Sequence, residues 1–158
     1  MTSLRILNVT QVYGLATSAS GQATTLVDIS RHLARRGHVV TVLTAAREGQ
    51  VIREQGGGVE VVGLPAVFRY RAITVNPGVV GFCLRRLREF DVVHLYGTYD
   101  LLGPGVAAFC RRWRVPYVLE PLGMFRPIVR NIGLKHAYRR LLGWPVVAGA
   151  ARVIATSE

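Results

Sequence analysis

Short apolar runs recur along the chain and alternate with segments that have the periodicity of a helix. The run Val39–Ala45 (VVTVLTA) is rich in valine and hardly alternates between apolar and polar positions, as is typical of a strand covered on both faces. Five further runs have the length and composition of strands: Arg5–Thr10, Val59–Leu64, Asp91–Tyr96, Pro116–Glu120 and Arg152–Thr156. The pattern therefore predicts a sheet of six strands, with a glycine turn over residues 56–58 before the third.

Helical periodicity separates most of these strands. Within Thr24–Gly37, the apolar residues Leu26, Ile29 and Leu33 recur on one helix face, and Gly37 is a natural C-terminal cap. The pattern also predicts helices over Gly78–Glu89, Pro104–Arg114 and Leu134–Leu142, and an irregular segment over Phe68–Pro77. Strands that alternate with helices form right-handed crossovers, so we expect an α/β fold: one domain with a doubly wound parallel sheet and helices on both faces.

The composition is that of a globular domain. Half of the residues are hydrophobic, yet no stretch approaches the ~18 consecutive apolar residues of a transmembrane helix. The N-terminus lacks the long apolar region of a signal peptide, so we expect a cytoplasmic protein. Cys83 and Cys110 do not form a CxxC motif and are expected to be small buried residues.

Charge is the unusual feature of the composition. The formal net charge is +11, and 19 of the 20 basic residues are arginine, with Lys135 the only lysine. Such a balance predicts an anionic partner, which could be a nucleic acid, a phosphorylated ligand or an acidic membrane surface. Nucleic acid is the least favoured of these because the sequence has no aromatic-plus-basic motif. The alternative is that this chain is the basic part of a larger, more acidic protein.

The segment after the first strand is a candidate anion site. In an open parallel sheet, ligands bind at the carboxyl ends of the strands. Gln11–Ala23 is small and polar and leads into a helix, whose N-terminal N–H groups suit a phosphate or carboxylate. Gly21 would let a ligand approach the backbone closely; the alternative is a flexible connection. The segment contains neither GxGxxG nor a P-loop, and Ala45 and Ala46 stand where a nicotinamide-binding strand would end in an acid.

Polar residues also follow the fourth and fifth strands. His94 lies within a strand pattern and is either a hydrogen-bonded core residue or part of a site, while residues 97–99 stand at the strand tip. Glu120 ends an apolar strand, where burial of an unpaired carboxylate is costly, so it needs a solvated cleft or a basic partner. The basic residues Arg126, Arg130 and Lys135 could supply that partner, bind phosphate, or form a solvated face.

The sequence does not favour a metal site or a nucleophilic triad. The histidines share no ligand spacing with one another or with cysteine; they are His32, His38, His94 and His136. No serine or cysteine lies in an elbow such as GxSxG. We therefore expect neither metal-dependent nor serine-hydrolase chemistry.

Several segments together resemble a known family. RILNV at Arg5–Val9, the Ser20–Gly21 turn, and LARRGHVVTVLT at Leu33–Thr44 resemble the opening of the retaining glycosyltransferases of family four, which have the GT-B fold. DVVHLYG at Asp91–Gly97 is similar to that family's fourth strand, and Pro116–Gly123, Lys135 and Ala151–Glu158 keep the family's order and approximate spacing. The resemblance covers essentially the whole chain. It implies that residues 1–158 form the N-terminal, acceptor-side Rossmann-like domain of a two-domain architecture, whose C-terminal nucleotide-sugar domain is absent from this chain.

The resemblance also implies an activity. It implies transfer of a sugar from a UDP- or GDP-sugar with retention at the anomeric carbon, without a metal or other cofactor, in envelope or exopolysaccharide synthesis. Residues 1–158 alone would be inactive. The implied partners are a sugar or lipid-linked acceptor, the C-terminal domain and, through a basic patch such as RRWR at Arg111–Arg114, the inner face of an acidic membrane. A different class of function remains open: a non-catalytic Rossmann-like module that binds anionic membrane or a phosphorylated ligand.

Site residues are carried over from the family position by position. The donor-phosphate loop would comprise Ser20, Gly21 and Gln22, with Gln22 in place of the second glycine of the family's usual Gly-Gly. Leu122-Gly123 stands where many members have His-Gly, so no catalytic histidine is carried over. The catalytic candidates are Glu120 and His94. The acceptor-binding candidates are Tyr96, Gly97, Thr98, Tyr99, Leu122, Gly123, Met124, Arg126, Arg130 and Lys135.

Overall fold

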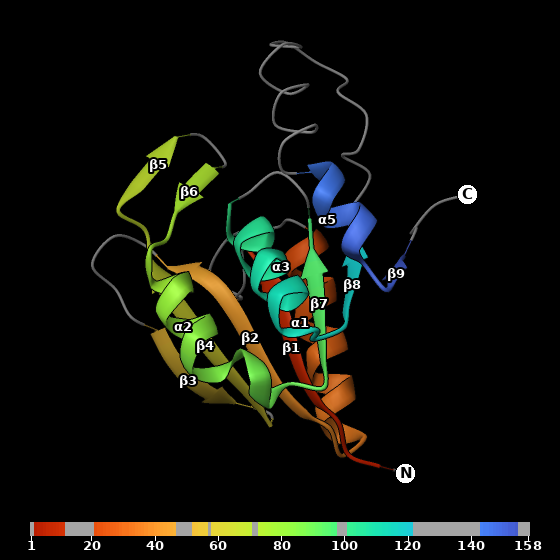
Figure 1. Cartoon of the computed structure of the whole chain (residues 1–158). Helices are drawn as coiled ribbons and strands as arrows, with labels where there is room; N and C mark the ends of the chain where they lie inside the picture. Colours follow the sequence, from red (N-terminus) through yellow and green to blue (C-terminus); the bar gives the residue numbers. More distant parts are fainter. Residues whose placement is uncertain are drawn as a thin grey trace.

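A seven-stranded sheet with helices on both faces forms the body of the protein (Figure 1). The structure is a computed structural model, and it describes residues 2–11, 21–46, 52–56, 58–70, 73–97, 101–121 and 143–154. The sheet has the strand order β3-β4-β2-β1-β7-β8-β9. Its strands are β1 (Arg5–Thr10), β2 (Val39–Ala46), β3 (Ile52–Gly56), β4 (Val59–Pro65), β7 (Val92–Tyr96), β8 (Tyr117–Glu120) and β9 (Arg152–Val153).

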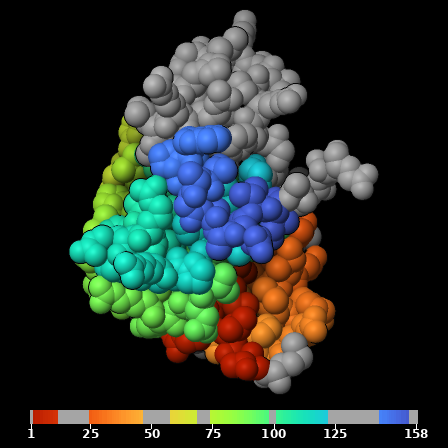
Figure 2. All heavy atoms as spheres, turned by 45° about the vertical axis from the view of Figure 1, so that its right-hand side comes forward, coloured from red at the N-terminus to blue at the C-terminus, as the bar shows by residue number. Residues whose placement is uncertain are grey.

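The described helices connect or flank these strands. They are α1 (Gly21–Arg35), α2 (Gly78–Arg86) with its short 3-10 continuation η1 (Leu87–Glu89), α3 (Leu102–Trp113) and α5 (Trp144–Gly149). A separate two-stranded hairpin, β5 (Phe68–Tyr70) and β6 (Ile73–Val75), stands beside the sheet (Figure 1). In the space-filling view, α5 lies against α3 (Figure 2).

The order of the strands reverses at the centre of the sheet. From β1 the chain passes through α1 to β2 and β4 on one side, and it then returns through α2 to β7 on the other side of β1. Both β2 and β7 pair with β1 in parallel. In open α/β sheets, the crevice at the carboxyl ends of the strands beside such a reversal is where ligands bind.

The two faces of the sheet pack against different helices. Leu7, Leu95 and Leu119 belong to a large apolar cluster that also contains residues of α2, α3 and α5. On the opposite face, Val40 and Val61 belong to a smaller cluster packed against α1. The helices therefore cover both faces, as the alternation of strands and helices predicts.

Most of the predicted elements are present, and six strands of the sheet are parallel as expected. The helix α1 begins at Gly21, three residues before the predicted Thr24. The strand β9 is described over two residues, and the predicted helix Leu134–Leu142 lies outside the described residues. The apolar run that contains α5 was not predicted to be helical.

One strand of the sheet was not predicted, and one expectation about its surroundings is wrong. Beside its six parallel strands the sheet contains β3, which pairs with β4 in an antiparallel hairpin closed at Gly58, whose φ is +80°. The sequence of β3, IREQG, has only one large apolar residue. A strand that pairs through its backbone without apolar side chains shows no hydrophobic pattern, so the sequence did not predict it. Phe68–Pro77 is not irregular. Its β5–β6 hairpin has strands of three residues, which are too short to display a period of two.

Candidate functional site

The candidate site is a row of polar side chains at the carboxyl edge of the sheet. Register pairs Thr44 of β2 with Thr10 of β1, Thr10 with Tyr96 of β7, and Tyr96 with Glu120 of β8. These four residues, hereafter the polar row, therefore stand level across four neighbouring strands. They include the β1–β7 boundary at which the strand order reverses.

A second polar level lies beneath the row. Two residues earlier along their strands, Asn8 of β1 pairs with His94 of β7, so both point to the same sheet face as the polar row. The Asn8 side-chain amide donates a hydrogen bond to Ser30 Oγ of α1 at 2.9 Å. This contact shows that the polar row and the level beneath it lie on the face that α1 covers.

Most of these polar side chains are buried. Asn8 is fully buried, and the exposed fractions of Thr44, Tyr96 and Glu120 are 2%, 4% and 5%. Burial of polar groups without hydrogen bonds is costly, so buried polar groups in folded proteins are usually paired. The carboxyl ends of the central strands therefore hold buried polar side chains, whereas the rest of these strands is mostly apolar.

His94 and Glu120 face each other across two strands. His94 Nε2 lies 3.2 Å from Glu120 Oε2, but the contact does not have the alignment of a hydrogen bond. Burial lowers the pKa of His94 to about 4 and raises the pKa of Glu120. The neighbouring Tyr96 hydroxyl lowers the pKa of Glu120 and so offsets part of the effect of burial. Because burial disfavours charge on both groups, His94 is neutral at pH 7 and the contact is not a conventional ion pair.

Tyr96 and Gly97 form the tip of β7. The Tyr96 ring lies 4.6 Å from the His94 ring, and burial together with the neighbouring Glu120 raises the pKa of the Tyr96 hydroxyl to about 12. Gly97 adopts a φ of +90°, and a Cβ placed there would meet nothing within 4 Å. Its N–H donates to Glu120 O at 2.9 Å. The tip therefore stays joined to β8, and the described residues leave room for a side chain at position 97.

The N-terminus of α1 is at the same edge. β1 ends at Thr10, and α1 runs from Gly21 back toward the start of β2, so its first turn stands at the carboxyl end of β1. Gly21 and Gln22 of the predicted donor-phosphate loop are the first two residues of this helix. The unpaired N–H groups and the dipole of a helix N-terminus favour a phosphate.

The remaining predicted site residues are not described by the structure. They are Ser20, Thr98, Tyr99, Leu122, Gly123, Met124, Arg126, Arg130 and Lys135. Of the predicted set, the structure therefore brings together His94, Tyr96, Gly97 and Glu120 at the sheet edge, with the start of α1 at the same edge.

Sequence reasoning missed the contributions of β1 and β2, namely Asn8, Thr10 and Thr44. Each is a polar residue inside a run that is otherwise largely apolar, RILNVT or VVTVLTA. A polar residue within an apolar run was the one feature of the sequence that could have identified them. It became specific only once the register placed the three residues beside Tyr96 and His94.

Within the described ranges, no group of three or more His, Cys, Asp or Glu residues is arranged to hold a metal ion. No helix among those same residues is long and apolar enough to cross a bilayer. Cys83 and Cys110 are free and buried, as the sequence predicted.

Comparisons with known proteins agree with this architecture. A family model described as "Glycosyl transferase 4-like domain" matches residues 20–158. A solved structure of sucrose-phosphate synthase from Thermosynechococcus elongatus matches with a TM-score of 0.64 at 15% identity, over 98% of this chain and 42% of that chain. The chain thus spans about two fifths of that protein, and the likeness confirms the Rossmann-like fold of one GT-B half.

A Vibrio parahaemolyticus protein of unknown function matches with a TM-score of 0.44 at 12% identity, over 99% of this chain and 94% of that chain, which is too distant to bear on the fold. No curated protein sequence matches this chain.

Proposed function

Because the chain belongs to the glycosyl transferase 4-like domain family, we propose that it is the acceptor-binding half of a retaining, metal-independent glycosyltransferase. The donor would be a UDP- or GDP-sugar, and the acceptor a sugar or lipid-linked sugar in envelope or exopolysaccharide synthesis. The observation that carries the proposal is the polar row at the reversal of strand order, beside the N-terminus of α1. It combines a place for hydroxyl groups with a place for phosphate.

The described residues have different roles in this proposal. The first turn of α1, at Gly21, meets the donor phosphate. Tyr96, Gly97 and Glu120 contact the acceptor, because they stand at the edge beside the open space around Gly97. His94 orients Glu120 rather than removing a proton, since an imidazole with a pKa near 4 is a weak base. The carboxyl of Glu120 is the group better suited to hold a hydrogen bond to the attacking hydroxyl.

A transfer assay tests the proposal directly. The full-length protein is incubated with UDP- and GDP-sugars and a panel of acceptors, and NMR determines the anomeric configuration of the product. We expect retention, no loss of activity on chelation of divalent metals, and no transfer by residues 1–158 alone. Inversion, dependence on a metal, or full transfer by residues 1–158 would contradict the proposal.

A pair of matched substitutions locates the acceptor site. Tyr96→Phe removes one hydroxyl from the polar row and should raise the acceptor KM roughly five- to tenfold, with little change in the donor KM. Tyr117→Phe is the control, because the Tyr117 hydroxyl lies on the opposite sheet face and donates to Val146 O. Equal effects of the two substitutions on the acceptor KM would argue against the polar row as the acceptor site.

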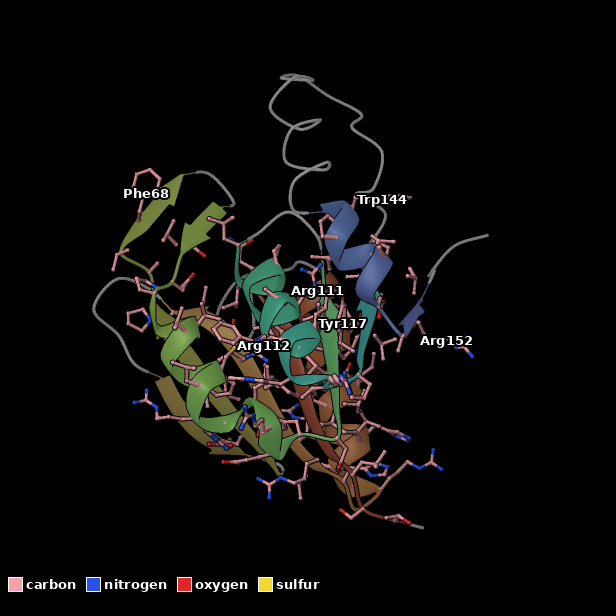
Figure 3. All side chains as sticks on the ribbon, in the orientation of Figure 1. Phe68, Arg111, Arg112, Tyr117, Trp144 and Arg152 are labelled. Atoms are coloured by element: carbon pink, nitrogen blue, oxygen red, sulfur yellow. The ribbon has the colours of Figure 1, made fainter. Side chains whose placement is uncertain are left out.

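A second function, contact with an anionic membrane surface, is favoured by the arginines of α2, η1 and α3. The acids around α2 are already paired: Glu60 accepts two hydrogen bonds from Arg86 at 2.8 Å, and Glu89 pairs with Arg5 at 2.9 Å. Five exposed arginines on these elements or at the C-cap of α3 make no ion pair within the described part of the chain; they are Arg85, Arg88, Arg111, Arg112 and Arg114. Figure 3 shows Arg111 and Arg112 on α3.

Vesicle flotation distinguishes this contact from a general effect of charge. Replacing Arg111, Arg112 and Arg114 by glutamate should abolish flotation with vesicles that contain an acidic phospholipid. The matched control replaces three arginines in a different part of the molecule, Arg31, Arg35 and Arg36 of the α1 region, and so changes the net charge by the same amount. If both triple variants lose binding equally, or the unaltered chain does not float, then the α3 arginines do not form a membrane surface.

A further inference from the structure

Four large apolar side chains are exposed on the β5–β6 hairpin and on the helix that follows it. They are Val67 and Phe68 at the start of the hairpin, and Val80 and Leu84 of α2, with exposed fractions of 66%, 57%, 47% and 61%. Val80 and Leu84 are one turn apart and therefore lie on the same face of α2. The hairpin stands at the N-terminal end of this helix (Figure 1). Single exposed apolar residues are common, but four on two consecutive elements indicate an interaction surface.

A buried polar anchor holds the hairpin at its base. Asn76, between β6 and α2, donates a hydrogen bond from its side-chain amide to Leu64 O at 2.8 Å, and it accepts one from Thr74 Oγ1 at 2.7 Å. The Val67 N–H donates to Val75 O at 2.9 Å and closes the base of the hairpin. Beyond this base the two strands pair only with each other, and Figure 3 shows Phe68 away from the main sheet. The hairpin is therefore a supported arm that carries an exposed aromatic ring.

Basic side chains flank the apolar residues of α2. Arg85 follows Leu84 directly and Arg88 lies one turn beyond it; both are exposed, and neither forms an ion pair with a described residue. The Arg88 guanidinium lies over the Trp113 ring, 4.7 Å from its centroid. A second copy of the chain placed on this face would bring like charges together, whereas an anionic surface would gain from them. The charge therefore selects an anionic occupant.

We propose that the four exposed apolar side chains enter the interfacial region of an acidic bilayer while Arg85 and Arg88 meet its phosphate groups. These six residues are hereafter the insertion surface. The inference rests on the membrane contact proposed above as a second function, and it adds a part of the binding that salt does not screen. A bilayer suits side chains that project from an arm and a helix surface, whereas segments of a protein partner are usually received in a groove.

Environment-sensitive labels at single positions test the insertion directly. The native thiols of Cys83 and Cys110 are fully buried, and burial raises the pKa of each to about 12, so a maleimide reacts at a newly introduced cysteine. The fluorophore NBD is attached in turn to Phe68→Cys, Leu84→Cys and Leu4→Cys. With vesicles of phosphatidylcholine and phosphatidylserine, we expect roughly a twofold rise in fluorescence at the first two positions, because the probe leaves water. The Leu4 position is the control, since it is also exposed but precedes β1 at the amino end of the sheet.

Salt separates the apolar part of the binding from the electrostatic part. Vesicle binding is measured at about 0.1 M and about 1 M salt, between which the Debye length falls from ~10 Å to ~3 Å. Replacing Phe68 and Leu84 together by serine should weaken binding roughly 30-fold at both salt concentrations. The matched control replaces Leu4 and Val39 by serine, which removes two exposed apolar side chains from the amino end of the sheet and should leave binding within about twofold. Circular dichroism verifies that each variant is folded.

The outcomes distinguish insertion from contact by charge alone. If the Phe68 and Leu84 double variant binds as the unaltered chain does, or if labels at both positions fail to respond, the insertion surface is overturned, even when the arginine variants lose flotation. Light scattering provides a separate check: a dimer that the double variant abolishes would assign these side chains to a second copy of the chain and would also overturn the inference. Absence of vesicle binding by the unaltered chain would instead remove the proposed membrane contact as a whole.

Discussion

The two faces of the same strands bury side chains of different kinds, apolar on one face and polar on the other. On the face covered by α2, α3 and α5, Leu95 and Leu119 pack in a continuous apolar cluster. On the face covered by α1, the adjacent residues Tyr96 and Glu120 belong to a polar row. Neighbours in sequence therefore serve opposite faces, because successive side chains of a strand alternate between them.

Two buried tyrosines make the difference concrete. Tyr117, on the apolar face, donates its hydroxyl hydrogen to Val146 O, and Figure 3 shows it below α5. Tyr96, on the other face, has a buried hydroxyl beside the Glu120 carboxylate, but it makes no well-aligned hydrogen bond. One face therefore satisfies its polar atoms internally and stabilises the fold, whereas the other holds unpaired polar atoms at the edge where ligands bind.

The largest expected effect comes from a substitution that creates a cavity in the apolar face. Leu119 is fully buried, so Leu119→Ala should lower the free energy of unfolding by about 2–5 kcal/mol, through lost burial and an unfilled cavity. Glu120→Gln, one residue further on, should change it by less than about 1 kcal/mol, because it preserves shape and removes a buried acid. Urea unfolding followed by circular dichroism measures both. Similar losses would mean that the faces share the stabilising role.

The docking of α5 on the apolar face gives the next largest effect. A Cβ added at Gly149 would lie 2.6 Å from the Tyr117 hydroxyl and 2.7 Å from Arg111 Cδ, and Arg111 also donates to Pro145 O. Gly149→Ala should therefore displace α5 and cost about 1–3 kcal/mol in unfolding free energy. Thermal unfolding of Gly149→Ala, compared with Ala150→Gly as a control that adds no atoms, checks the prediction. An unchanged or raised Tm would show that the contact yields without cost.

His94 makes the stability of the polar face depend on pH. Its pKa is lowered from 6.5 to about 4 by burial, so the unfolded chain binds a proton between these values and the folded chain does not. This contribution to stability is complete above pH 6.5 and is lost as the pH falls toward 4. It amounts to about 2 kcal/mol between pH 7 and pH 5. The raised pKa of Glu120 acts in the opposite direction as the pH falls, so the contrast between the unaltered chain and His94→Gln isolates the histidine.

Unfolding free energies measured at both pH values provide the test. His94→Gln should show a smaller loss of stability between pH 7 and pH 5 than the unaltered chain. Parallel losses in the two proteins would place His94 in a solvated position rather than a buried one.

The sequence predicted the apolar face better than the polar one. Long apolar runs and helical periodicity identified six strands and the main helices, because burial on a continuous face leaves a repeating pattern. The β3 and β5–β6 strands were missed because short polar or three-residue strands pair mainly through their backbones. Tyr96 and Glu120 were candidates because they stand at strand ends, and His94 because it is a polar residue within a strand pattern. Asn8 and Thr44 were not, because a polar residue within an apolar run becomes informative only through its partners in register.

The smallest predicted effect compares two threonines of β2, one on each face of the sheet. Thr44 Oγ1 is buried without a hydrogen-bond partner, and valine has nearly the same shape as threonine. Thr44→Val should therefore raise the unfolding free energy by about 1 kcal/mol, because it removes a buried hydroxyl that has no hydrogen bond. Thr41→Val is the control: its hydroxyl donates to Glu60 Oε2 at 3.0 Å, on the other face, and its loss should destabilise the chain by about 1 kcal/mol. The two substitutions remove the same atom from the same strand, so opposite signs in urea unfolding would show that the faces differ in purpose and not only in polarity. If Thr44→Val instead destabilises the chain as Thr41→Val does, the hydroxyl of Thr44 has a structural partner, and the polar row is part of the core.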